Sequence, residues 1–68
     1  MIAADLSRRH LGAAVAWGNA VCDIHELRHT DRYVVVLEYT EHGTVRWHMD
    51  IPPHAEITIL NSQEEIPA

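Results

Sequence analysis

Tyr33-Val34-Val35-Val36-Leu37-Glu38-Tyr39 is the stretch that decides the fold of this chain. Six of its seven residues are β-branched, aromatic or leucine, and such side chains fit the pleated, half-buried surface of a sheet. Turn-forming residues bound the stretch, with His29-Thr30-Asp31-Arg32 before it and Glu41-His42-Gly43 after it. The stretch therefore predicts the central strand of a β-rich domain.

Residues 44–51 alternate between apolar and polar side chains without interruption. This period of two predicts a strand with one face in the core and the other toward water or a partner. Pro52-Pro53 ends the strand because proline has no backbone N–H to donate to a sheet. The predicted core face comprises Val45, Trp47, Met49 and Ile51, and the polar face comprises Thr44, Arg46, His48 and Asp50.

Weaker signals place a short helix and two strands before the central strand. A capping residue, Asp5 or Ser7, and a terminating Gly12 predict a helix over residues 5–11. Gly18-Asn19 predicts a tight turn between two strands because both residues tolerate positive φ. These elements extend the β-rich pattern toward the N-terminus.

The strand that follows this turn changes phase before it ends. Ala20, Cys22 and Ile24 share one face at a spacing of two, but Leu27 does not fit that phase. A β-bulge near His25-Glu26 would return Leu27 to the interior. We therefore predict a bent second strand.

With a last strand over residues 56–60, the pattern predicts five short strands in an all-β domain. A chain of 68 residues has room for one domain with a thin core. A barrel is predicted because a flat sheet would leave one apolar face in water. We predict a single small β-barrel domain over residues 1–60, followed by a flexible acidic tail over residues 61–68.

The order of these elements resembles that of Sm-like proteins: a helix, Leu11-Gly12, a strand, a turn, Ala20-x-Cys22-x-Ile24-x-x-Leu27 and a long third strand. The Pro52-Pro53-His54 link is similar to the short 3₁₀ connection of SH3-like barrels. The resemblance covers about residues 5–60 and implies a five-stranded SH3-like or Sm-like small barrel with a short N-terminal helix. Arg28-His29-Thr30-Asp31-Arg32 stands where Sm-like proteins place their RNA-binding residues, so that function is not implied.

His25-Glu26-Leu27-Arg28-His29 matches the H-E-x-x-H signature of zinc hydrolases. In that signature two histidines one helical turn apart bind Zn²⁺ and the glutamate activates water. The motif must lie on a helix, yet here a strong strand follows it after three residues, and no third ligand has a recognised spacing. We interpret it as a bent strand. His25 and His29 remain candidate metal ligands, and a zinc-dependent hydrolase is the second alternative function.

Charge and cysteine content narrow the function classes. The net charge of -5, with five arginines and no lysine, argues against binding to a phosphate backbone. The lone Cys22 excludes an intramolecular disulfide, so self-association is the remaining support for so small a core. Arg8-Arg9-His10 is interpreted as a solvated basic patch, with anion binding as the alternative.

The leading hypothesis is a non-enzymatic interaction module that forms a homo-oligomer, binds a protein partner and needs no cofactor. An oligomeric Sm-like binder of RNA or nucleotides is the first alternative. We expect a cytoplasmic location without a membrane partner, because the apolar residues around Leu11-Gly12 are too few and too interrupted for a signal peptide. The candidate binding residues are Arg46, His48, Asp50, Arg28 and Arg32.

Overall fold

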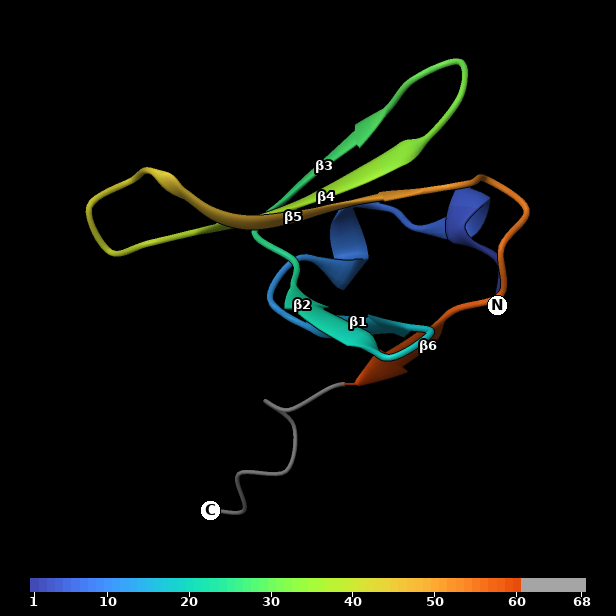
Figure 1. Cartoon of the computed structure of the whole chain (residues 1–68), viewed down its shortest axis with the longest axis horizontal. Helices are drawn as coiled ribbons and strands as arrows, with labels where there is room; N and C mark the ends of the chain where they lie inside the picture. The colour runs from blue at the N-terminus through green and yellow to red at the C-terminus, as the bar shows by residue number, and fades with distance from the viewer. Residues whose placement is uncertain (61–68) are drawn as a thin grey trace.

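The computed structural model describes residues 1–60, which form two three-stranded antiparallel sheets lying one above the other (Figure 1). The strand order is β2-β1-β6 in one sheet and β3-β4-β5 in the other. The predicted all-β class is thereby confirmed, whereas the tail predicted over residues 61–68 lies outside the described residues. The strands are β1 (Ala14–Trp17), β2 (Ala20–Asp23), β3 (Glu26–His29), β4 (Val34–Tyr39), β5 (Val45–Ile51) and β6 (Thr58–Leu60).

Two 3₁₀ helices, η1 (Ala3–Asp5) and η2 (Arg8–His10), precede β1, so the prediction of one helix over residues 5–11 is wrong. The chain between them is extended, with Leu6 at ψ 138°, which lets this leucine enter the core with only 3% of its surface exposed. A hydrogen bond of 3.0 Å from the Ser7 backbone N–H to His10 Nδ1 holds η2. Burial of one apolar side chain thus interrupts the helix.

The second predicted strand is divided at Ile24 and His25 into β2 and β3. β2 pairs with β1 and β3 pairs with β4, so this corner passes the chain from one sheet to the other. Cys22 and Ile24 are buried, and Leu27 is half-buried against the core beyond the corner. The predicted phase change therefore occurs, one residue earlier than expected.

β6 is shorter than the predicted strand over residues 56–60, and the two sheets do not close into one barrel among residues 1–60. The link between β5 and β6 pairs instead with the N-terminal segment. The Ala3 N–H donates to the Ala55 carbonyl at 3.0 Å, and the Ala4 N–H donates to the Pro53 carbonyl at 2.8 Å. These bonds tie the link to the N-terminal segment.

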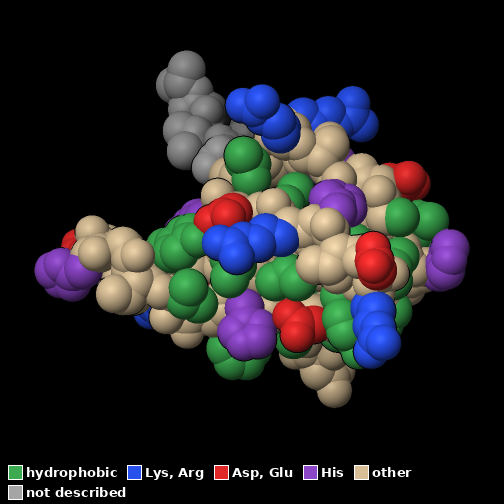
Figure 2. All heavy atoms as spheres, turned by 90° about the horizontal axis from the view of Figure 1, so that it is seen from above, with side chains coloured by type: hydrophobic (Ala, Val, Ile, Leu, Met, Phe, Trp, Pro, Cys, Tyr) green, Lys and Arg blue, Asp and Glu red, His purple; other side chains and the backbone are tan. Residues whose placement is uncertain are grey.

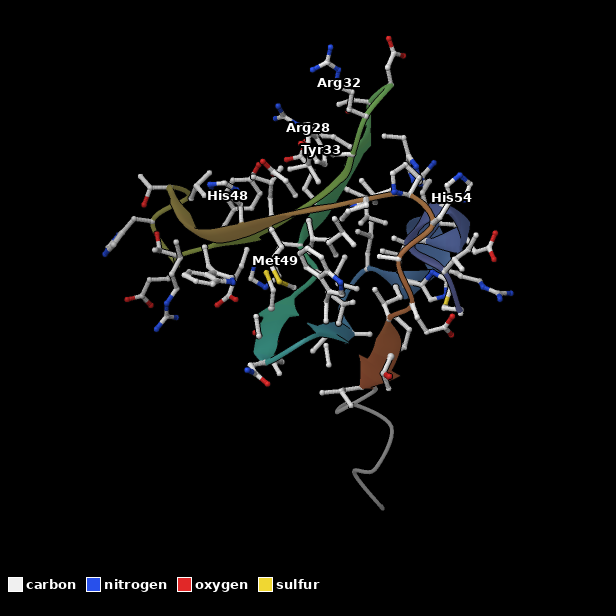
Figure 3. All side chains as sticks on the ribbon, turned by 45° about the vertical axis from the view of Figure 1, so that its right-hand side comes forward. Arg28, Arg32, Tyr33, His48, Met49 and His54 are labelled. Carbon is white, nitrogen blue, oxygen red and sulfur yellow. The ribbon has the colours of Figure 1, made fainter. Side chains whose placement is uncertain are left out.

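The predicted core face of β5 is correct at one end and wrong at the other. Met49 and Ile51 are buried, but Trp47 is 49% exposed and Val45 is 50% exposed. The register shifts between Glu38 and Tyr39 of β4, and this β-bulge takes Val45 out of the phase of the core face. Figure 3 shows Met49 pointing from β5 toward β1 and β2, while His48 points the opposite way.

The core lies between the two sheets and is entirely apolar, with no buried charged or polar residue among residues 1–60. Its largest fully buried side chains come from β1, β2, β4, β5 and the β2–β3 corner. No helix among the described residues has the length and apolar character needed to cross a bilayer. The buried set that joins the sheets is Ala3, Leu6, Val15, Cys22, Ile24, Val34, Val36, Met49, Ile51 and Ile57.

Candidate functional site

The outer face of the β3-β4-β5 sheet gathers three of the five predicted binding residues. Arg28 and Asp50 both pair with Val35, so these residues form one row across the sheet. His48 pairs with Leu37 in the neighbouring row. Seen from above, charged and histidine side chains lie among hydrophobic ones on this side of the molecule (Figure 2). The predicted polar face is therefore a surface of mixed polar and apolar side chains.

The charges on this face pair with one another. Arg28 Nε lies 2.9 Å from Glu26 Oε2, and His48 Nδ1 lies 3.4 Å from Asp50 Oδ1. All four side chains are well exposed, so solvent screens these pairs and they add little to stability. Because the positive charge of Arg28 is already matched by Glu26, Arg28 offers little net attraction to an acidic partner.

The other two predicted binding residues lie elsewhere. Arg46 sits at the β-bulge with its Nη1 atom 3.9 Å from Glu38 Oε2. Arg32 belongs to the turn between β3 and β4, where the Thr30 hydroxyl accepts the backbone N–H groups of Arg32 and Tyr33. In Figure 3, Arg32 lies beyond Arg28 and Tyr33 at the tip of this hairpin. The five residues do not converge on one point.

A small hydrogen-bond network lies on the same outer face, next to the corner between β2 and β3. The Tyr39 hydroxyl donates to Glu26, whose other carboxylate oxygen accepts from Arg28. The hydrogen bond from Tyr39, and then that from Arg28, lowers the pKa of Glu26, while the same carboxylate raises the pKa of Tyr39. The His25 ring stacks on Tyr39 with centroids 6.4 Å apart, and His25 Nδ1 accepts the Tyr39 backbone N–H at 2.8 Å.

The H-E-x-x-H motif lies on the β2–β3 corner and on β3, not on a helix. The two histidines bind different parts of the chain: His25 contacts Tyr39, whereas His29 Nε2 lies 3.1 Å from the Leu6 carbonyl oxygen. No group of three or more potential metal ligands lies together among residues 1–60. The helical geometry that the zinc hydrolase hypothesis requires is therefore missing from this motif.

A pocket of about 390 Å³ lies between the 3₁₀ region and β3. Leu6, Leu11 and Leu27 supply its apolar walls, and Arg8 and Glu26 supply charge. This pocket could not be predicted from the sequence, because it joins residues that are about twenty positions apart. The only signal that the sequence offered was the basic patch that begins at Arg8.

The exposure of Trp47 is a second feature that the sequence pattern did not predict. It shares the core-facing side of β5 with Met49, yet about half of its surface is exposed. It is not among the half-buried apolar side chains that pack against the core, which are Trp17, Ala20, Leu27, Ala55 and Ile59. Trp47 thus lies on the inner face of the β3-β4-β5 sheet, but beyond the edge of the core.

Cys22 is buried, and its Sγ donates to the Asp23 carbonyl at 3.3 Å. Burial, and then the nearby Glu38 carboxylate, raises the pKa of this thiol to about 11. The thiolate is the reactive form of cysteine, so a buried thiol that stays protonated is a poor nucleophile. The geometry therefore makes Cys22 a core residue.

We expect the Cys22 thiol to resist iodoacetamide in the folded protein at about pH 8 and to react fully in urea. The raised pKa also means that its contribution to the free energy of unfolding is complete below pH 9.0 and is lost as the pH rises toward about 11. Urea titrations between these values should show stability falling in the wild type and a shallower fall in Cys22→Ala. Rapid alkylation of the folded protein would contradict this assignment.

Comparisons of the chain with protein-family models, with curated proteins and with solved structures gave no match. Two surfaces remain as candidate binding sites: the exposed end of β5, which carries Val45 and Trp47, and the pocket beside β3.

Proposed function

We propose that this chain is a small, partly open barrel of the SH3-like or Sm-like type that acts as a non-enzymatic interaction module, self-associating and binding a protein partner. The barrel interpretation is supported by the short corner at Ile24 and His25, which makes β2 and β3 one bent strand shared by both sheets. The strands then follow a single order, β6-β1-β2/β3-β4-β5, as a five-stranded barrel requires.

The exposed end of β5 is the observation that carries the proposal. β5 is the longest strand and lies at an edge of its sheet. An unpaired edge offers backbone donors and acceptors to another strand. Trp47 and Val45, each about half exposed, add large apolar side chains beside that edge, and tryptophan is prominent among the residues that dominate binding energy at interfaces.

A second copy of the chain is the occupant that we assign to this surface. A 68-residue domain has too little interior to cover Trp47 itself, and a copy of the same edge supplies equivalent apolar area. The net charge of -5 opposes association, but this charge falls toward zero as the pH approaches the isoelectric point of about 5.5. Repulsion between copies should then decrease.

Static light scattering over a concentration series at about pH 8 and about pH 5.5 tests the proposal. We expect a mass above the 7.7 kDa of one chain that rises with concentration, with stronger association at the lower pH. The wild type should show this behaviour without added ligand. A mass of 7.7 kDa at every concentration and at both pH values would overturn self-association.

A further inference from the structure

The pocket beside β3 combines an apolar interior with an open mouth. Leu6, on one wall, is 3% exposed, and Leu27, on the opposite wall, is half-buried. Leu11 also lines the pocket but is 43% exposed, which leaves an apolar side chain in water. The volume of about 390 Å³ lies within the range of sites that hold small ligands or large side chains. Filling the pocket would remove this apolar surface from water.

Two of the polar groups at the pocket already have partners within the chain. His29 Nε2 lies 3.1 Å from the Leu6 carbonyl oxygen, which ties the 3₁₀ region to β3. The Glu26 carboxylate accepts hydrogen bonds from Tyr39 and Arg28, so its charge is neutralised locally. The walls are therefore fixed before any ligand arrives.

The remaining charge at the pocket is positive. Arg8 lines it and Arg9 follows in η2, and both side chains are exposed. Neither arginine forms an ion pair with another residue in 1–60, although the chain as a whole carries an excess of carboxylates. The unpaired Arg8 beside an apolar interior is complementary to a ligand that is both acidic and apolar.

The position of the pocket favours a peptide as its ligand. β3 is the edge strand of its sheet. Glu26 lies on the outer face of that strand and Leu27 on the inner face, yet both line the pocket, so the pocket wraps around the strand edge. An extended peptide can pair with such an edge through its backbone while a side chain enters the neighbouring pocket.

We propose that this pocket binds an extended acidic peptide of a partner protein: one large apolar side chain enters between Leu6 and Leu27, and a flanking carboxylate pairs with Arg8. The proposal rests on the proposed function, since it specifies the chemistry of the protein partner. It uses a surface distinct from the exposed end of β5. Peptide binding and self-association can therefore fail independently.

The test uses a fluorescein-labelled decapeptide with one leucine flanked by two glutamates on each side, titrated with the full chain and followed by anisotropy. We expect saturable binding with a Kd below about 1 mM. Arg8→Glu should weaken it at least about tenfold, because an attractive ion pair becomes a repulsive one. Arg32→Glu is the matched control, since Arg32 is equally cationic and exposed but lies in the β3–β4 turn, and it should leave the affinity within about twofold.

Two further probes complete the test. Replacing the leucine of the peptide by alanine should weaken binding at least about fivefold, and exchanging its glutamates for arginines should restore binding to Arg8→Glu. The titrations are repeated with Trp47→Asp, which separates peptide binding from self-association. Absence of binding at about 1 mM protein, equal effects of Arg8→Glu and Arg32→Glu, or equally tight binding of octanoate would each overturn the proposal.

Discussion

Ile51→Ala should remove a large part of the stability of the folded protein. Ile51 is fully buried on β5, pairs with Val34 and lies among the large side chains that join the two sheets. Truncating a buried isoleucine to alanine costs about 2–5 kcal/mol through lost apolar burial and the cavity left behind. A domain of this size has a total free energy of unfolding of only about 3–10 kcal/mol. One substitution therefore removes a large part of it.

Urea unfolding followed by circular dichroism measures this effect. Leu60→Ala is the matched control: it also shortens a branched aliphatic side chain in a strand, but Leu60 is 41% exposed, so its loss should cost below about 1 kcal/mol. Ile51→Val should be intermediate, at about 0.5–1.5 kcal/mol. If Ile51→Ala unfolded within about 1 kcal/mol of the wild type, Ile51 would not lie in the core.

Trp47→Asp should weaken self-association by more than about tenfold while leaving the monomer folded. Trp47 is 49% exposed and no described residue of the chain covers its outer half, so a polar side chain is tolerated there in the monomer. In the associated form the same substitution removes an apolar anchor and places a charge in the interface. Truncation of such anchors costs about 2 kcal/mol or more, which corresponds to a factor of about thirty in the dissociation constant.

Dilution calorimetry gives this dissociation constant, and the circular dichroism spectrum checks the fold. Val21→Asp is the matched control, because Val21 is 57% exposed but lies on the outer face of the other sheet, paired with Ala16. The dissociation constant of Val21→Asp should equal that of the wild type. Equal weakening by both substitutions would mean that added negative charge, rather than the end of β5, controls association.

The strand pattern could be predicted because it depends on local sequence. β-branched residues specified β4, alternation specified β5, and the phase of Leu27 indicated the corner between β2 and β3. The exposure of Trp47 could not be predicted, since alternation shows which side of a strand faces inward but not how far the opposite sheet extends. The change of phase at Val45 depends on a bulge that has no glycine or proline to mark it.

The candidate binding surfaces could be predicted from the sequence even less well than the strands. Arg28, His48 and Asp50 do share a face, as alternation and pairing imply, but only the strand register shows that Arg28 and Asp50 lie in one row across the sheet. The pocket depends on the contact between Leu6 and His29, which lie 23 positions apart. Leu37 is buried on the outer face, contrary to what strict alternation would suggest. These features arise from long-range packing.

Sedimentation equilibrium of the wild type beside Trp47→Asp, at matched concentrations and about pH 8, tests the central claim that the exposed end of β5 is a self-association surface. We expect the wild type to fit a reversible equilibrium between one chain of 7.7 kDa and a larger species, and Trp47→Asp to remain at 7.7 kDa over the same range. A wild type that stays at 7.7 kDa throughout, or a variant that associates as tightly as the wild type, would contradict the claim.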